Sequence, residues 1–253
     1  VISYATAMGK LIDVDLFVDV MLERKKSGQG QDAGYDAQDI VMAIDHAVGL
    51  QILEEDSQKK GFMLFTHKKI RDHFDLILTA AERISLHASI ARKIFERTDK
   101  ESDSLYYDLT FHYSEARDHA NIINYAFIAG LIAKSNYAYE LAVNYFNQVI
   151  RSIEENRSFA EDAVLMKKWI SCNEEIGGIC LTIGEIEKGI DLYRIILQYK
   201  NTPIEKAAIY RQICMAYFKI GNWTMSEEYG RKGLQLLGES LPIGRFAVLA
   251  GIV

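Results

Sequence analysis

The stretches CNEEIGGICLTIGEIEKGIDLYRIILQYK (residues 172–200) and IYRQICMAYFKIGNWTMSEEYGRKGLQLL (residues 209–237) decide the fold, because both carry one helix–turn–helix pattern. An aromatic or polar residue opens each first helix, and an apolar residue beside a small one follows at helical spacing. A glycine turn comes next, then a small residue and an aromatic residue in the second helix. The matched positions are Asn173, Ile176, Gly177, Cys180, Gly184, Gly189, Tyr193 and Leu197 in the first copy and Tyr210, Ile213, Cys214, Tyr217, Gly221, Ser226, Tyr229 and Leu234 in the second.

Small residues stand where the two helices of each copy must cross closely. They are Gly177 and Gly189 in the first copy and Cys214 and Ser226 in the second. A bulky side chain at such a crossing would force the two helix axes apart. We therefore predict that each copy forms a tightly packed helical hairpin.

The pattern resembles the tetratricopeptide repeat, in which W-x₂-L-G-x₂-Y in the first helix is followed by A-x₃-F in the second. Gly221 lies 37 positions after Gly184, slightly more than the family's period of about 34 residues. Each glycine follows a predicted helix end, where a left-handed residue costs least. The extra residues precede Thr202-Pro203-Ile204-Glu205, which has the N-cap threonine, first-turn proline and capping-box glutamate of a helix start. The resemblance implies a helical repeat array, an α-solenoid.

Composition and charge limit the classes to which the protein can belong. The chain has 253 residues, of which 49% are apolar, and a formal net charge of −6. That charge argues against a general nucleic-acid binder, whose domains are usually basic. The three cysteines, Cys172, Cys180 and Cys214, show no CxxC spacing and fall on predicted buried helix faces. They indicate reduced core residues of a cytoplasmic protein.

Both ends of the sequence suggest a piece of a longer protein. The chain begins at Val1 without a methionine, and residues 244–253 form an apolar run. This run is shorter than the roughly 20 residues that span a membrane. We expect a further packed helix there and no membrane segment.

The first 100 residues predict a winged-helix-like domain, and residues 101–253 the repeat array. Asp36 is the expected N-cap of one helix, and Thr79 with Glu82 forms a capping box before another. The predicted elements are helices over residues 1–8, 15–22, 36–48, 67–78 and 80–97 and strands over 51–55 and 62–66, with a polar loop over 23–35.

The repeat region begins with a degenerate copy. Its signature is Ala126, Ala129, Gly130 and Ala133, followed by Ala142 and Phe146. Further helices are predicted over residues 105–116, 121–134, 139–153, 160–182 and 185–199, so the fold class is mainly α with one β-hairpin.

The order of a winged helix and then helical repeats resembles the region that follows the nucleotide-binding core in STAND-type AAA+ signalling ATPases. The stretches that carry the resemblance are 50–55, 65–71, 79–87, 111–118 and 236–242. The resemblance implies a multidomain parent with ATP and magnesium in an upstream domain. It also implies a downstream output module such as a GAF domain, a histidine or serine/threonine kinase, or a cyclase.

This chain lacks the motif that would hold the nucleotide. No G-x-x-x-x-G-K-[ST] sequence occurs, and Gly9-Lys10 lacks the flanking residues of that loop. The glycines of residues 28–34 follow a charged helix end instead of a strand, so we interpret them as a loop. We predict no cofactor-binding residue in this segment.

No arrangement of side chains predicts catalysis or a metal site. The histidines lack the spacing of metal ligands on one helix face, and no serine or cysteine lies in a nucleophile elbow. His67 is expected to order the junction between the second strand and its helix. We therefore predict that this segment is not an enzyme.

Two surfaces are candidates for binding. A recognition helix over residues 36–48 would carry Asp36, Asp39 and Asp45 without a lysine or arginine, which disfavours a phosphate backbone. The candidate residues for a phosphate contact are Lys68, Lys69 and Arg71.

In a repeat array the first helix of each pair lines the concave face. Candidate protein-binding positions there are Asn173, Arg211, Gln212 and Met215.

The leading prediction is a non-catalytic regulatory and protein-interaction segment of a signalling ATPase. It would couple the upstream nucleotide-binding core to the output module by rigid-body movement of stacked helices. The alternatives are a winged-helix transcription regulator that binds DNA and a stand-alone tetratricopeptide adaptor that binds peptides.

Overall fold

The computed structural model describes residues 1–26, 35–97, 102–155 and 162–240. The predicted loop over residues 28–34 and the apolar run over 244–253 lie outside these ranges. The chain divides into two compact units, Val1–Ala129 and Gly130–Val253. The domain boundary near residue 100 stays a prediction, and each unit is described by itself.

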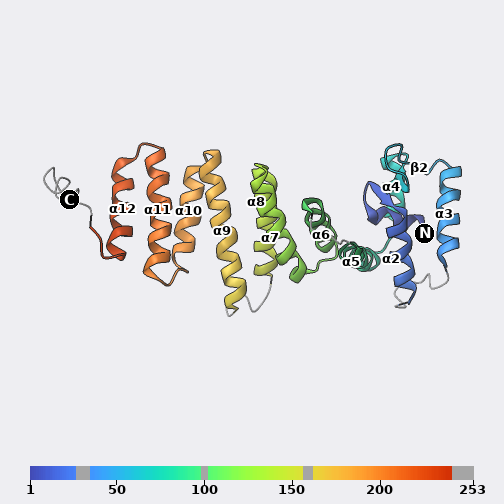
Figure 1. Cartoon of the computed structure of the whole chain (residues 1–253), viewed down its shortest axis with the longest axis horizontal. Helices are drawn as coiled ribbons and strands as arrows, with labels where there is room; N and C mark the ends of the chain where they lie inside the picture. The colour runs from blue at the N-terminus through green and yellow to red at the C-terminus, as the bar shows by residue number, and fades with distance from the viewer. Residues whose placement is uncertain (27–34, 98–101, 156–161, 241–253) are drawn as a thin grey trace. The chain divides into compact units, whose positions relative to one another are not determined.

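The first unit contains several helices and a small sheet (Figure 1). Its elements are α1 (Ile2–Ala5), the 3₁₀ helix η1 (Thr6–Met8), β1 (Leu11–Asp13), α2 (Val14–Lys26), α3 (Ala37–Gly49), β2 (Leu53–Glu55), β3 (Phe62–Phe65), α4 (Lys68–Asp75), α5 (Ala80–Arg97), α6 (Asp103–Glu115) and most of α7 (His119–Ser135).

The sheet contains one strand more than the sequence predicts. The predicted hairpin of β2 and β3 is present, and β1 adds to the other edge of β3 in the order β1-β3-β2, all antiparallel. In the β1 pairing Ile12 lies opposite Met63, and Ile12 is buried. Treating residues 9–13 as a mere connection was wrong, because a strand this short forms through a partner far along the chain.

The predicted helix starts at Asp36 and Thr79 are confirmed, and several other bounds differ. The helix predicted over residues 1–8 is divided into α1 and η1, and the helix predicted from residue 160 begins at Ala163. Asp36 and Asp39 form a reciprocal capping box at α3, and Thr79 and Glu82 bond each other's backbone N–H groups before α5. The helix α2 continues to Lys26 instead of ending near residue 22, and α4 ends at Asp75 instead of residue 78.

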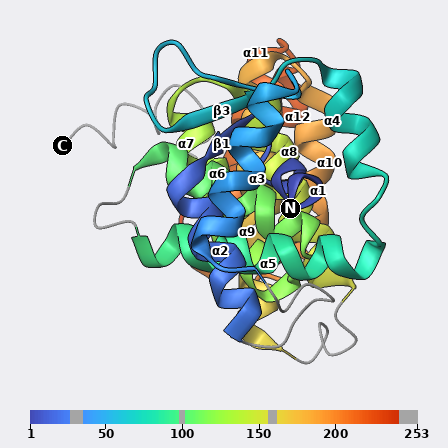
Figure 2. The same ribbon diagram turned by 90° about the vertical axis from the view of Figure 1, so that its right-hand side faces the viewer.

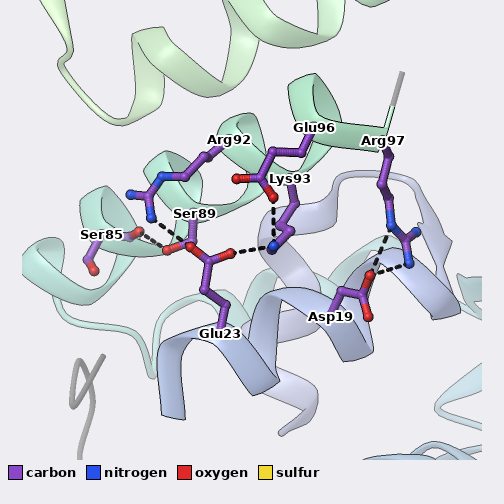
Figure 3. Close-up of polar contacts among 8 residues, drawn as sticks. All are labelled: Asp19, Glu23, Ser85, Ser89, Arg92, Lys93, Glu96 and Arg97. Atoms are coloured by element: carbon purple, nitrogen blue, oxygen red, sulfur yellow. Dashed lines mark hydrogen bonds and ion pairs between the residues drawn. The ribbon is translucent and has the colours of Figure 1, made fainter. Parts of the chain in front are cut away.

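The helices α2 and α5 cross in the first unit (Figure 2) and bury Phe17, Val20, Leu86 and Ile90 between them and the remaining core. A row of ion pairs closes one side of this crossing (Figure 3). The carboxylate of Glu23 on α2 meets Arg92 over 2.6 Å and Lys93 over 2.9 Å, both on α5. A second pair joins Asp19 on α2 to Arg97 on α5 over 2.6 Å. These two helices are thus fixed by apolar packing and by charge.

The second unit stacks helical hairpins. After the end of α7, its helices are α8 (Tyr139–Glu154), α9 (Ala163–Ile183), α10 (Ile186–Leu197), α11 (Pro203–Lys219) and α12 (Trp223–Leu236). The helices α9 and α10 lie side by side, as do α11 and α12, and α11 also packs on α10 (Figure 1). The predicted mainly helical fold, with a β-hairpin and a tetratricopeptide-like repeat array, is confirmed.

The turn and capping residues of this unit are those the sequence predicts. Gly184 ends α9 in the left-handed conformation at φ 92°. Thr202 and Glu205 form the capping box of α11, and Pro203 occupies its first position. A Cβ atom on Gly189 would lie 3.1 Å from the carbonyl oxygen of Gly177. The hairpin of α9 and α10 therefore requires small residues at its crossing, as predicted.

Candidate protein-binding groove

An open groove of about 630 Å³ runs between α11 and α12. Its lining is almost wholly apolar, with Arg211 and Glu227 as the charged residues among those that line it. The other lining residues are Ile204, Ala207, Ala208, Cys214, Trp223, Ser226, Gly230, Gly233, Leu234 and Leu237. Concave apolar surfaces with a few polar groups at the edge are typical binding sites.

Two glycines of α12, Gly230 and Gly233, line the groove, and a Cβ atom on them would lie 3.4 Å from Cys214 and Tyr210 of α11, respectively. These glycines lie 37 positions after Tyr193 and Ile196 on α10, next to Tyr229, which the repeat pattern matches with Tyr193. Tyr193 and Ile196 are buried in a core that includes Ile209 of α11. Among the described residues, which end at residue 240, no helix covers the groove in the way that α11 covers α10.

Large apolar side chains flank the groove at both ends and remain in contact with water. At one end Trp223 is 63% exposed, and its ring meets Phe218 edge to face at a centroid distance of 4.9 Å. At the other end Ile204 is 73% and Leu237 is 50% exposed. A contiguous exposed apolar patch of this kind marks an interaction surface.

The structure separates the four predicted concave-face residues. Arg211 and Met215 are exposed on α11, and Arg211 lines the groove. Gln212 is half-buried. Asn173 is only 6% exposed, and its amide donates a hydrogen bond to the carbonyl of Trp169 over 2.9 Å. Asn173 therefore satisfies the backbone of α9 and does not belong to the exposed face.

The three predicted phosphate-contacting residues lie in the first turn of α4. Lys68 and Lys69 are exposed, whereas Arg71 is half-buried and forms an ion pair with Asp72 over 3.4 Å. The outer face of α3 carries the exposed carboxylate of Asp45 beside Met42, which is 68% exposed. This combination of acidic and apolar groups does not suit a phosphate backbone.

A buried pair of histidines joins α5 to α6, and the sequence did not predict it. The Nδ1 atoms of His87 and His112 are 2.9 Å apart, so one ring donates a hydrogen bond to the other. Burial lowers the pKa of His87 to about 4, with a further contribution from Arg83, and lowers the pKa of His112 to about 3. Both rings are neutral at pH 7. The available signal was the position of His87 on the apolar face of α5, where Leu86 and Ile90 are buried.

The three cysteines are free thiols and differ in exposure. Cys172 and Cys180 are buried, and burial raises the pKa of Cys172 to about 12. Cys214 is half-buried and lines the groove. Cys214 is therefore placed to report on whether the groove is covered.

Within residues 1–26, 35–97, 102–155 and 162–240, no three or more His, Cys, Asp or Glu side chains come together as a metal-binding group. No helix in the same ranges has the length and apolar character needed to cross a membrane.

Among the known proteins compared with this chain, only solved structures are similar to it. No protein-family model and no curated protein matches the chain. A structure titled MamA MSR-1 shares 16% identity at a TM-score of 0.38, covering 61% of this chain and 88% of its own. A putative kinesin light chain from Podosopora anserina with nearly identical TPR-like repeats shares 12% identity at a TM-score of 0.44, covering 87% and 93%. BtubC from P. vanneervenii shares 10% identity at a TM-score of 0.41, covering 92% and 94%. TM-scores below 0.5 support neither a family nor a function, so the repeat fold rests on the hairpins described above.

Proposed function

We propose that the second unit is a non-catalytic protein-interaction module that accepts an apolar helix in the groove between α11 and α12. One observation carries the proposal. The groove is the counterpart, one hairpin later, of the face on α9 and α10 that α11 covers. Each repeat of a helical array buries its apolar face only against a neighbour. We therefore infer that the groove on α11 and α12, which no helix of the described residues covers, receives a helix.

The chemistry of the groove favours a helix with large apolar side chains. Gly230 and Gly233 leave room that the incoming side chains must fill, since a void forfeits packing contacts. Burying an exposed side chain such as Trp223 or Leu237 stabilises the complex by about 1.5–3 kcal/mol for each residue. Arg211 and Glu227 at the edge carry opposite charges. They contribute more to the orientation of the bound helix than to its affinity.

The topology of the first unit supports the wider proposal of a regulatory segment in a multidomain signalling ATPase. Its elements run helix, strand, helix, helix, strand, strand, with the sheet order β1-β3-β2. This order supports the proposal that the first unit is a winged-helix domain, which the resemblance to STAND-type proteins places before the repeats. In this proposal ATP and magnesium bind an upstream domain, and a kinase or cyclase lies downstream in a cytoplasmic parent.

Each unit contains a rigidly packed group of helices, and such groups could transmit movement between the domains of the proposed ATPase. In the first unit, α2 and α5 are held by their shared core and by the ion pairs of Glu23 and Asp19. In the second unit, α9 to α11 share one apolar cluster. Rigid elements that touch their neighbours through packed faces can pass a displacement along the chain.

A peptide titration tests the proposed groove. The probe is a synthetic peptide of residues 203–219, the sequence of α11, which already covers the equivalent face of the first hairpin. In a Trp169→Phe chain, Trp223 is the one remaining tryptophan. We expect its emission to shift to shorter wavelength and to saturate with added peptide. The measurement is repeated with Val248→Asp and Ile252→Asp, so that the chain's own apolar C-terminal residues cannot compete.

The matched control fills the groove with residues of the first hairpin. Gly230→Tyr with Gly233→Ile places there the side chains that α10 carries at Tyr193 and Ile196. We expect this variant to keep its helical content and to lose the peptide response. An unchanged Trp223 emission in both C-terminal backgrounds, or an equal response in the filled variant, contradicts the proposal.

A further inference from the structure

A small open cavity lies in the first unit between η1, α4, α5 and α6, and its volume is about 170 Å³. One water takes about 30 Å³ of liquid, so the cavity has room for a ligand of about five or six heavy atoms. The charged and aromatic side chains around it are Arg71, Asp72 and Asp75 of α4, Arg83 and His87 of α5, and Phe111 and Glu115 of α6. None of these residues lines the groove between α11 and α12, so the cavity is a separate candidate site.

One ring nitrogen of His87 opens into this cavity. The side chain is only 4% exposed, and its Nδ1 atom bonds to Nδ1 of His112 over 2.9 Å. In the described part of the chain no residue bonds to the other nitrogen, Nε2. Nε2 is not among the side-chain atoms that the protein encloses without a partner, so it faces the cavity that His87 lines. Because buried polar groups normally have a partner, a ligand would supply the one that Nε2 lacks.

The ring of His87 offers this ligand a lone pair without a charge. Burial lowers the pKa of His87 to about 4, so the ring is neutral at pH 7. When His87 donates its Nδ1 proton to His112, Nε2 carries the lone pair and accepts hydrogen bonds. The fitting partner for Nε2 is then an N–H or O–H donor.

The charges around the cavity leave one carboxylate without a partner. Arg83 pairs with the Asp75 carboxylate over 2.8 Å and donates to the Asp75 backbone carbonyl over 3.0 Å. Arg71 pairs with Asp72 over 3.4 Å. Glu115 is exposed and forms no ion pair or side-chain hydrogen bond with any residue that the structure describes. Three carboxylates thus face two arginines, and one negative charge is left over.

An aromatic ring stands beside the unpaired carboxylate. Phe111 is 50% exposed, and its ring meets that of His87 edge to face at a centroid distance of 5.7 Å. Phe111 and Glu115 are four residues apart on α6, so both lie on the same face of this helix. The face of an aromatic ring attracts organic cations. A carboxylate and a ring together therefore favour a positively charged ligand.

We propose that this cavity binds a small organic ammonium ion. The N–H groups of the ligand donate to the Glu115 carboxylate and to Nε2 of His87, and its alkyl part lies against Phe111. The two arginines repel it little, because each is already paired with an aspartate. An anionic ligand would instead meet the unpaired charge of Glu115. A bound ligand touches α4, α5 and α6 at once, so its occupancy would hold these helices together.

Calorimetric titration of the full chain at pH 7 tests the charge of the ligand. The probes are propylammonium, alanine and propionate, which share one carbon chain and differ in charge. We expect propylammonium to bind and to raise the melting temperature, since a ligand of the folded state stabilises it. Alanine and propionate should bind at least roughly tenfold more weakly. The ¹⁵N resonance of His87 Nε2 should shift with propylammonium alone, because this nitrogen gains a hydrogen bond.

Glu115→Gln and His87→Phe remove the two proposed acceptors one at a time. Glu115→Gln should weaken propylammonium binding by roughly tenfold or more, because a charge-assisted hydrogen bond is lost. His87→Phe keeps a ring in the core and should also weaken binding. Glu54→Gln is the matched control, since Glu54 is exposed on β2 and does not line the cavity. This control should bind as the natural chain does.

Four outcomes overturn the inference. Propylammonium fails to bind, or alanine or propionate binds as tightly. Binding that survives both Glu115→Gln and His87→Phe places the ligand elsewhere. An equal loss in Glu54→Gln shows diffuse attraction to the net charge of −6. If His87→Phe does not fold, Glu115→Gln decides alone, because this side chain is exposed and its loss leaves the core intact.

Discussion

The Ser226 hydroxyl donates a hydrogen bond to the backbone carbonyl oxygen of Cys214 over 3.1 Å, where α12 crosses α11. The same crossing on the preceding hairpin joins Gly189 to Gly177, 37 positions earlier in each case. There the helices approach so closely that a Cβ atom on Gly189 would meet the Gly177 carbonyl at 3.1 Å. A small residue is thus required at both crossings, and in the second one its hydroxyl also ties the two helices together.

Gly189→Ala should destabilise the second unit. The new methyl group would lie 2.7 Å from the Cδ2 atom of Leu181 and close to a backbone oxygen that cannot move freely. We expect a loss of about 1–3 kcal/mol in the free energy of unfolding, measured by denaturant titration. Gly178→Ala is the matched control, because its Cβ would make only an ordinary contact at 3.6 Å with the Tyr193 hydroxyl. That control should gain up to about 1 kcal/mol from helix propensity. Equal effects of the two substitutions would contradict the close crossing.

Local signals in the sequence were sufficient to predict the hairpins and their ends. The Thr202 and Glu205 capping box, the turn at Gly184 and the N-cap Asp36 each depend on a few neighbouring residues. Such signals act within one or two helical turns, so they can be recognised without the fold. The small residues of the crossings were also predictable, because their spacing recurs in both copies.

Features that depend on distant partners were not predictable. The strand β1 exists because Ile12 pairs with Met63, and the pair of His87 and His112 forms only when α5 packs on α6. The groove could not be predicted either, since its lining residues come from both α11 and α12, and only the packing of these helices brings them together. The accessibility of Asn173 could not be predicted for a similar reason, and the structure leaves it only 6% exposed. Its polar side chain bonds to the backbone of its own helix instead of facing water.

Acid should weaken the first unit through the histidine pair. The folded pKa of His87, about 4, and of His112, about 3, both lie below the ordinary value of 6.5. The unfolded chain therefore binds more protons below pH 6.5, so this stability is present above that pH and is lost as pH falls. Lowering the pH from 7 to 5 should cost about 2 kcal/mol for each histidine, measured by denaturant titration at each pH.

The matched controls for this prediction separate the buried pair from other acid effects. His112→Leu removes a titrating ring from the core, and we expect a shallower dependence of stability on pH between 5 and 7. His46→Gln changes an exposed histidine near the end of α3 and should leave the slope as it is. A natural chain equally stable at pH 5 and pH 7 would show that the pair is not neutral and buried in solution.

Glu23→Gln should loosen the crossing of α2 and α5. Burial raises the pKa of Glu23, but its bonds to Lys93 and Arg92 outweigh this and lower it overall. The stabilisation is therefore present above the ordinary pKa of a glutamate and is lost as pH falls through the lowered value. We expect the variant to lose about 1 kcal/mol at pH 7 and low salt, and less near 1 M salt, where charges are screened within about 3 Å.

Glu228→Gln is the control for that ion network. Glu228 pairs with Lys232 one turn along the same helix over 2.6 Å, and both side chains are about half exposed. Single exposed pairs of this kind contribute about 0.3–0.5 kcal/mol. A Glu23 variant no less stable than the Glu228 variant would show that the network joining α2 to α5 adds nothing beyond ordinary surface charge.

Duplex DNA should not bind this chain. The exposed face of α3 presents Asp39 and Asp45 to any phosphate backbone, and in α4 Arg71 is already paired with Asp72. We expect no change in the fluorescence anisotropy of a labelled duplex at about 50 mM salt, where phosphate contacts are strong. Binding that falls with salt, and that weakens when Lys68, Lys69 and Arg71 are all changed to Gln, would restore the DNA-binding alternative. Changing Lys188, Lys206 and Lys232 to Gln removes the same charge from the second unit. An equal loss of binding in that variant would instead indicate attraction by net charge alone.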